Sequence, residues 1–370
     1  MTLTLYFVRR FLRNFLLVAI AFSAVMMLID SIEQLRRFSG AGIGLERILL
    51  MASLNLPSAI YTLLPLLILL ATMAMFIGLA RSSELVVARA AGRSALRMAL
   101  APAMVAFVLG AIGVVALNPV VAATAKRYDM LADRILSGGT AAASIGREGV
   151  WLRQGAAGAD MAQRQSVIHA ERGNADATVL YDVTVMEFSL DQGPIRYLQA
   201  DDATLVSGAW RLSNAKEWPL ATTENPETEA VIHTDMSLPS DLTPARIRDS
   251  FGAPSEIAIW DLPDFIAALD RAGFSSRRHE TWFQKELAQP LMLAAMALLA
   301  AAFTMRHVRR GRVGLMALLA FGSGVAALLL RNFAQALGEN GLLPVLLAAW
   351  APPLVALLAA LTLMLYLEDG

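Results

Sequence analysis

The sequence predicts a multi-pass membrane protein, with six transmembrane α-helices and an all-β domain inserted between the third and the fourth. Three observations predict this fold class. Of the 370 residues, 56% are hydrophobic and only 17% are charged, whereas soluble domains carry about a quarter charged residues. The apolar residues gather in long spans, three before and three after a polar middle stretch. That middle stretch consists of short alternating segments separated by turn residues, the pattern of antiparallel β structure.

Each predicted span is long enough to cross a bilayer, which takes about 20 mostly apolar residues in a helix. The first span has the shortest uncharged part, Asn14–Ile29. It is long enough to cross the bilayer only if the arginines of residues 9–13 extend their charged ends to the membrane interface. A cleavable signal peptide is the alternative for this N-terminus, but the apolar run continues past Ala21 to Leu28. The other spans are Ile48–Ala80, Met98–Ala125, Leu287–Met305, Val313–Leu330 and Asn340–Leu367.

Arginine placement predicts the orientation of these spans. Three arginine clusters precede the first span, separate the second from the third, and separate the fourth from the fifth. If six helices alternate, all three clusters fall on one side, which the positive-inside rule makes cytoplasmic. Both termini are then cytoplasmic and the large domain lies outside, which in the inner membrane of a bacterium is the periplasm. The clusters are Arg9, Arg10 and Arg13; Arg81, Arg89, Arg93 and Arg97; and Arg306, Arg309, Arg310 and Arg312.

The chain is expected to divide at the composition changes. Residues 1–125 hold the first three spans, with a short cytoplasmic helix at about 82–92 between the second and the third. Residues 126–260 form the exported β domain, for which a sandwich, a jelly roll or an open barrel is expected. Residues 261–284 form a connecting helix and linker, with an amphipathic helix over Leu262–Gly273, and residues 285–370 hold the last three spans.

Alternating segments locate the strands of the exported domain. They are Val150–Arg153, Ser166–Ala170, Val179–Leu190, Ile195–Leu198, Ala203–Val206, Ala209–Leu212 and Ala230–His233. Asp201 and Asp202 fall between two of them and are expected in a solvated turn. Such a domain can bind along an open sheet edge or hold acyl chains inside an open barrel, and a passive extramembrane module is the alternative.

The sequence argues against an enzyme. The absence of Cys excludes disulfides, thiolate metal sites and cysteine nucleophiles. The four histidines, at positions 169, 233, 279 and 307, form no H-E-x-x-H pattern, and there is neither a G-x-S-x-G elbow nor a P-loop. A triad assembled from distant residues is the only catalytic alternative. The formal net charge of zero gives no support to a nucleic-acid partner, and no bound cofactor or metal is expected.

The charged segment between the second and third spans has the signals of a short helix. Ser82 or Ser83 is placed to cap it, Glu84 lies in its first turn, where the helix dipole favours a carboxylate, and Gly92 is placed to end it. This helix is suited to docking into a groove on a cytoplasmic partner. On these residues alone, a capped helix lying on the membrane surface is equally compatible.

The run Arg81–Gly92 (RSSELVVARAAG) resembles the coupling helix of the lipopolysaccharide-export permeases, the LptF/LptG family. Three further motifs agree: Leu35–Arg37 at the outer end of the first span, Leu287–Leu291 at the start of the fourth, and Leu337–Pro344 before the last. The order of spans and β insertion matches too, so the resemblance covers essentially the whole chain. The E-L-V-V sequence that begins at Glu84 is more similar to the LptG branch of the family than to the LptF branch.

This resemblance implies a permease subunit of an ABC exporter, which extracts lipopolysaccharide from the inner membrane and passes it to a periplasmic protein bridge. It implies an LptF-like partner permease, an LptB-like ATPase dimer that uses the ATP, and LptC- and LptA-like proteins that join a periplasmic jelly roll. Glu84 matches the acidic residue of the family's coupling helix and is expected to transmit ATPase motion, with Arg89 in support.

Lipopolysaccharide carries phosphates beside acyl chains, so an extraction cavity should present cations near its rim. The expected rim cations are Arg36, Arg37, Arg331, Lys126 and Arg127. Arg36 and Arg37 end the first span, where the family carries basic residues, and Arg331 lies inside a span, where charged residues are usually functional. Interfacial snorkelling is the alternative for these arginines, and Asp30 and Glu33 lie near enough to neutralise the first pair.

Two other functions stay open. An ABC permease of the lipoprotein-release or efflux type also carries a large periplasmic domain, but such subunits normally have four spans. A membrane-anchored periplasmic scaffold or sensor would need no ATPase and would tolerate charge reversal at Glu84.

Overall fold

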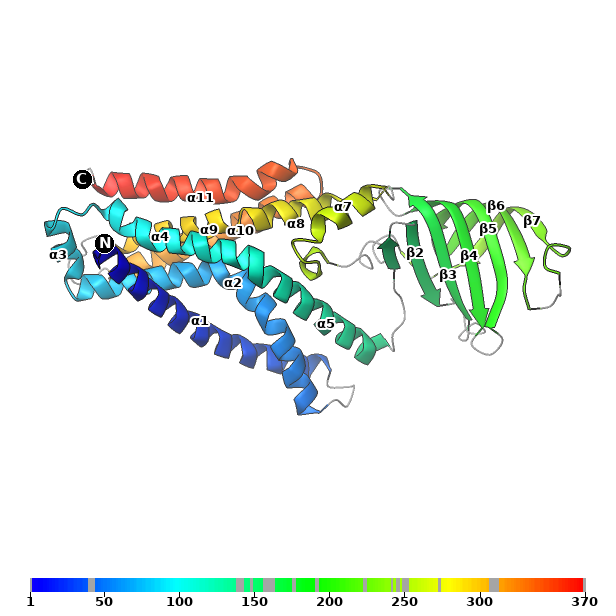
Figure 1. Ribbon diagram of the computed structural model, residues 1–370, viewed down its shortest axis with the longest axis horizontal. Helices are drawn as coiled ribbons and strands as arrows, with labels where there is room; N and C mark the ends of the chain where they lie inside the picture. Colours follow the sequence, from blue (N-terminus) through cyan, green and yellow to red (C-terminus); the bar gives the residue numbers. More distant parts are fainter. Residues whose placement is uncertain are drawn as a thin grey trace. The chain divides into compact units, whose positions relative to one another are not determined.

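The computed structural model describes residues 2–38, 44–137, 143–146, 149–155, 164–174, 178–189, 193–221, 225–240, 242–243, 247, 253–271, 274–305 and 313–368. They form two compact units, a helical one and one built around a β-sheet (Figure 1). The helical unit comprises Met1–Leu131, Ser255–Trp260 and Arg277–Gly370, and the β unit comprises Ala132–Pro254 and Asp261–Ser276. The arginine cluster predicted at positions 306–312 lies outside the described residues.

The helical unit contains long helices and one short one. They are α1 (Thr2–Arg37), α2 (Leu45–Arg81), α3 (Glu84–Ala90), α4 (Ala95–Ile112), the π-helical segment η2 (Gly113–Leu117), α5 (Asn118–Ser137), α8 (Arg277–Leu287), α9 (Gln289–Thr304), α10 (Val313–Glu339) and α11 (Val345–Glu368). α4, η2 and α5 follow one another without a break, so the predicted third span is one long helix with a π-helical segment in its middle.

Five of these helical segments are long and apolar enough to cross a membrane, and a sixth span arises if the bent pair α8–α9 counts as one. The predicted transmembrane class with an inserted β domain is therefore confirmed. The predicted fourth span, Leu287–Met305, corresponds to α9, and the bend of 50° between α8 and α9 at its start was not predicted. Pro290 stands in the first turn of α9, and a proline at this position cannot donate the hydrogen bond that would continue the preceding helix.

α9 lies at the centre of the helical unit. It packs against α2, α4, α10 and α11, and the side chains of Met292, Leu293 and Met296 are fully buried. α4 approaches especially closely, since a Cβ added to Gly110 would lie 2.6 Å from the Cα of Pro290. Small residues permit this spacing between helices.

The β unit is built on one antiparallel sheet whose described strands are neighbours in sequence order. The strands are β1 (Ala143–Gly146), β2 (Gly149–Gly155), β3 (Arg164–Gly173), β4 (Val179–Ser189), β5 (Gly193–Val206), β6 (Ala209–Pro219) and β7 (Val231–Pro239). The turn predicted at Asp201 and Asp202 is wrong, because both residues lie inside β5. The exposed side chain of Asp201 accepts a hydrogen bond from Asn214 of β6, so a strand accommodates this carboxylate without burying it.

One face of the sheet carries the apolar core of this unit. Val183, Val185 and Trp210 are buried on it, together with Leu269 of the helix α7 (Leu262–Arg271) and Phe274. A short 3₁₀ helix, η3 (Pro254–Glu256), precedes α7. A Cβ on Gly173 would lie 2.5 Å from the Phe274 ring, so the glycine makes room for that ring. The predicted amphipathic helix over Leu262–Gly273 is confirmed as α7 within the described residues.

Candidate functional site

The short helix α3 is held by its apolar side and presents a second apolar side to its surroundings. Leu85 and Ala88 are each 6% exposed and belong to the core of the helical unit. Val86 and Val87 are exposed. A helix of seven residues is unstable alone in water, so the contacts of Leu85 and Ala88 fix its position. The exposed valines leave an apolar surface suited to another protein.

The expected serine cap of α3 is wrong, although the predicted end of the helix is confirmed. Ser83 precedes the helix with a left-handed φ of 59° and makes no side-chain cap hydrogen bond. The Ser82 hydroxyl instead donates to the Glu84 carboxylate at 2.7 Å, with the Gly78 carbonyl as a more distant alternative acceptor at 3.1 Å. The left-handed residue turns the chain sharply between α2 and α3, which removes Ser83 from the usual N-cap geometry. Gly92 has φ of 79°, as the end of the helix requires.

The carboxylate of Glu84 is bonded to residues of α1 as well as to its own turn. The Tyr6 hydroxyl donates to Oε2 at 2.6 Å, and Nη1 of Arg10 lies 2.8 and 2.9 Å from the two carboxylate oxygens. The Ser82 hydroxyl donates to Oε1 at 2.7 Å. These donors, Tyr6 first, then Ser82 and Arg10, lower the pKa of Glu84 to about 2. The carboxylate is therefore ionised throughout the physiological pH range.

Arg89 attaches the other end of α3. Its Nη2 donates to the backbone carbonyl of Met305, the C-cap residue that directly follows α9, at 3.3 Å. The last carbonyls of a helix lack partners within the helix, and a cation there is favoured by the helix dipole. The two residues predicted to act in coupling thus connect α3 to two different long helices.

The helices α1 and α5, which carry four of the predicted rim residues, are joined by hydrogen bonds to one tyrosine. Arg36 and Arg37 end α1 with exposed side chains, and Lys126 and Arg127 are exposed on α5. The link between the helices is Tyr128, whose hydroxyl accepts from Nη1 of Arg37 at 3.1 Å and exchanges hydrogen bonds with the buried Gln34. Sequence reasoning missed Tyr128 and Gln34.

Asp30 is directed toward neighbouring amides. Its Oδ1 accepts from Asn55 of α2 at 2.9 Å and from Gln34 at 3.4 Å. The suggestion that Asp30 neutralises the arginine pair is therefore not supported by its hydrogen bonds.

Arg331 lies apart from the exposed rim residues, in the interior of the helical unit. It is 8% exposed, and the negative charge of the buried Glu286 favours its guanidinium. Glu286 is 1% exposed, and its Oε2 accepts from Tyr61 and, at 3.4 Å, from Asn118. Lys285 places its Nζ 4.0 Å from Glu286 Oε1. This group of polar side chains joins α2, α5, α8 and α10 and was not found from the sequence.

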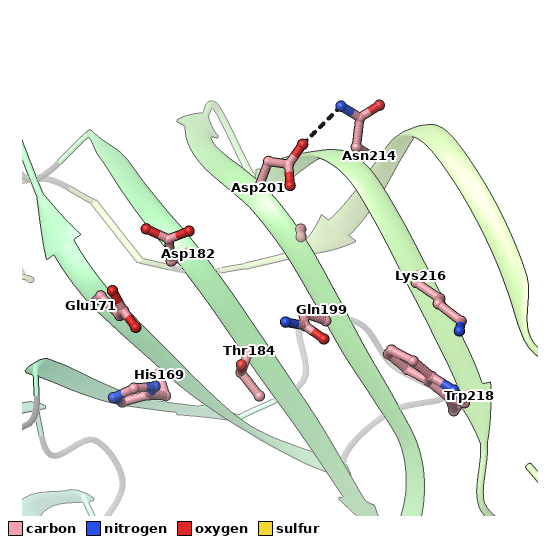
Figure 2. A pocket seen from close by; sticks show the side chains of 10 residues that line it. His169, Glu171, Asp182, Thr184, Gln199, Asp201, Asn214, Lys216 and Trp218 are labelled. Carbon is pink, nitrogen blue, oxygen red and sulfur yellow. Dashed lines mark hydrogen bonds between the residues drawn. The ribbon is translucent and has the colours of Figure 1, made fainter. Parts of the chain in front are cut away.

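The β unit has an open polar hollow of about 370 Å³ on the face opposite its core (Figure 2). Two rows of side chains cross strands β3 to β6 there. The first row is His169, Thr184, Gln199 and Lys216, and the second is Glu171, Asp182, Asp201 and Asn214. Three carboxylates against one lysine make this surface repulsive to phosphate, so it is a poor candidate for binding the phosphates of a lipid. No group of three or more potential ligands among the described residues could hold a metal ion.

Comparison with known proteins gives a consistent result. The family model described as "Lipopolysaccharide export system permease LptF/LptG" matches residues 5–366. The chain is also similar to the lipopolysaccharide export system permease protein LptG of Haemophilus influenzae, with 24% identity over 289 residues. That alignment covers 78% of this chain and 76% of the relative.

Proposed function

Because the chain belongs to the lipopolysaccharide export system permease LptF/LptG family, we propose that it is an LptG-like permease subunit of an ABC exporter that extracts lipopolysaccharide from the inner membrane. The observation that carries the proposal is the family match over residues 5–366, which includes both the apolar helices and the inserted sheet. The lipoprotein-release and efflux alternatives predict four spans, fewer than the five or six found in the described residues.

The proposed orientation places α3 and both termini in the cytoplasm and the β unit in the periplasm. Within the helical unit, the contact of Tyr6 with Glu84 puts the start of α1 at α3. The C-terminus also lies at this end of the helical unit (Figure 1). The segment that contains the β unit leaves through α5 and returns through α8. This arrangement supports the orientation indicated by the arginines.

The proposed partners follow from what the chain lacks and what it exposes. The sequence has no P-loop, so a separate LptB-like ATPase dimer would bind and hydrolyse ATP, while this chain holds no cofactor. Val86 and Val87 of α3 offer that ATPase an apolar contact. A second, LptF-like permease would complete the lipid cavity, and LptC- and LptA-like proteins would receive the lipid from the β unit.

Phosphate recognition is proposed for the cations at the outer end of α1, Arg36 and Arg37, and for those in the middle of α5, Lys126 and Arg127. Guanidinium groups bind phosphate through charge-assisted hydrogen bonds. Tyr128 supports this role because it holds Arg37 beside α5. Arg331 is the weakest member of the predicted set, since it is buried beside Glu286.

The test is ATP-driven release of lipopolysaccharide from proteoliposomes that contain both permeases and the ATPase, with a periplasmic acceptor protein outside. We expect Glu84→Lys to abolish either ATPase copurification or release while membrane insertion stays normal. Asp264→Lys, on the exposed side of α7, is the matched control and should behave as wild type. Normal assembly and release in Glu84→Lys would contradict the coupling role.

The orientation has a separate test. Reporter fusions after residues 88 and 200 should report opposite compartments. If both report the same compartment, the proposed exporter topology is wrong.

A further inference from the structure

The Glu84 carboxylate uses its hydrogen-bonding capacity inside this chain. Oε1 is bonded to Arg10 and Ser82, and Oε2 to Tyr6 and Arg10. A carboxylate that served only as a contact for the ATPase would be expected to face outward with its oxygens in water. The side chain is 38% exposed, yet three protein donors, Tyr6, Arg10 and Ser82, already bond its two oxygens. Glu84 therefore binds residues of its own chain, and its role includes these contacts.

The two α1 residues are arranged for this contact. Tyr6 and Arg10 are one helical turn apart and face the same direction, with the guanidinium carbon 5.6 Å from the centre of the Tyr6 ring. The Tyr6 hydroxyl accepts from Arg10 and donates to Glu84, so it orients both charged groups. The Arg10 side chain is only 17% exposed. It passes α2 at Gly78, where an added Cβ would lie 3.5 Å from its Nη2 and any longer side chain would obstruct it.

The remaining contacts of α3 attach it to the helical core and to α9. Leu85 and Ala88 pack in the helical core, and Arg89 is bonded to the end of α9. The hydrogen bonds of Glu84 are therefore the polar connection from α3 to α1. Charge-assisted hydrogen bonds are about twice as strong as neutral ones, so this connection resists separation of the two helices better than apolar contacts alone.

We propose that Tyr6 and Arg10 are positioning residues that pass motion of α3 to α1 through the Glu84 carboxylate. This inference rests on the proposed function, since it takes α3 as the element that the ATPase moves. It differs from a direct contact of Glu84 with the ATPase in one respect: residues of α1 that the ATPase need not touch become necessary for coupling.

The experiment measures lipopolysaccharide released per ATP hydrolysed by the complete complex in proteoliposomes. Arg10→Gln should lower this ratio about fivefold, as loss of a charge-assisted but partly exposed contact predicts. Tyr6→Phe keeps the ring and should lower it about twofold. Arg9→Gln is the matched control, because it removes the neighbouring, exposed positive charge of α1 and should leave the ratio unchanged.

A charge exchange separates coupling from general damage. Arg10→Glu and Glu84→Arg should each reduce the ratio, and the double variant should regain at least half of the wild-type value. A double variant no better than either single variant would overturn the proposal. The same conclusion would follow if Arg10→Gln and Tyr6→Phe both matched Arg9→Gln.

A distance measurement gives a readout that does not need transport. The chain has no native cysteine, so a pair of spin labels would report the distance between the two helices. The labels are placed at Ala91→Cys, the exposed residue that caps the end of α3, and at the exposed Leu16→Cys of α1. We expect one narrow distance, unchanged by ATP, in the wild-type background, and a broad or ATP-dependent distance with Arg10→Gln. An identical narrow distance in both backgrounds would refute the connection.

The outcomes also separate this inference from the proposed function. A wild-type complex that releases no lipopolysaccharide with ATP would contradict the proposed function. A wild-type complex that works, loses coupling with Glu84→Gln and keeps it with both α1 variants would leave the function standing and remove the connection to α1.

Discussion

The buried charges of the helical unit predict an unequal response to charge removal. Glu286 lies 4.0 Å from the ammonium group of Lys285, and its negative charge also favours the charge of the buried Arg331. Glu286→Gln removes the buried anion that stabilises both cations, whereas Arg331→Met leaves the Lys285–Glu286 pair intact. We therefore expect Glu286→Gln to destabilise the protein far more than Arg331→Met. Adding Arg331→Met to Glu286→Gln should restore part of the lost stability.

The structure gives the magnitude. At the 4.0 Å between Lys285 Nζ and Glu286 Oε1, two unit charges attract by about 4 kcal/mol at an effective dielectric constant near 20. Removing one partner of a buried pair costs about 3–5 kcal/mol in proteins, which agrees with this value. For Arg331→Met we expect about 1–2 kcal/mol, because only one of the two cations is lost and an apolar side chain fills its space.

The assay is unfolding of the purified protein in mixed micelles, followed by tryptophan fluorescence, with a free energy of unfolding for each variant. Glu33→Gln, at an exposed position near the end of α1, is the control and should change stability by less than about 0.5 kcal/mol. The reasoning is refuted if Arg331→Met is the more destabilising single variant. It is also refuted if the two losses simply add in the double variant, since charges that stabilise each other must couple.

Three further predictions concern other parts of the chain. Because the pKa of Glu84 is lowered from 4.5 to about 2, its stabilising contribution is complete above pH 4.5 and is lost progressively as the pH falls from 4.5 through about 2. In a carboxylate NMR titration, Tyr6→Phe should move the midpoint of Glu84 upward, and an unmoved midpoint would contradict the hydrogen bond. Gly110→Leu should disrupt the packing of α4 on Pro290 and cost at least about 1–3 kcal/mol in the same unfolding assay; wild-type stability would show that the two helices can separate. Phe274→Ala should destabilise the β unit by about 3–5 kcal/mol, seen as earlier proteolysis of that unit in the full chain, and an unchanged proteolysis profile would contradict its core position.

The sequence predicted the parts of the fold that local patterns specify. Apolar runs located the spans, alternation located the strands, and Gly92 marked the end of α3, because these features depend on residues close together in the chain. α8 was expected to be linker, since its charged sequence has no apolar run. It is a helix with buried polar residues because α10 and α11 pack against it, and this neighbourhood is not encoded locally.

The sequence identified residues of the candidate site, but it did not identify the residues that they contact. Glu84 and Arg89 were chosen from a local motif, and both lie where α3 joins other helices. The partner of Glu84 was not predicted, because Arg10 is 74 residues away along the chain. The sequence favoured an interfacial role for Arg10, and a long arginine side chain near a helix end is compatible with either position. The packing of α1 on α2 decides whether the Arg10 side chain lies at the membrane interface or beside Glu84.

Arg331 shows which sequence signal could have revealed the buried charge group. A charged residue inside an apolar span requires a partner, because an unpaired charge in that environment is costly. Tyr61 and Asn118 are also polar residues within apolar helices, and Glu286 directly precedes the apolar stretch of α9. Considering these four residues as one set, rather than each span alone, would have favoured an internal partner for Arg331 over the lipid phosphates. Their convergence at the bend between α8 and α9 gives that bend a polar anchor that an apolar span could not provide.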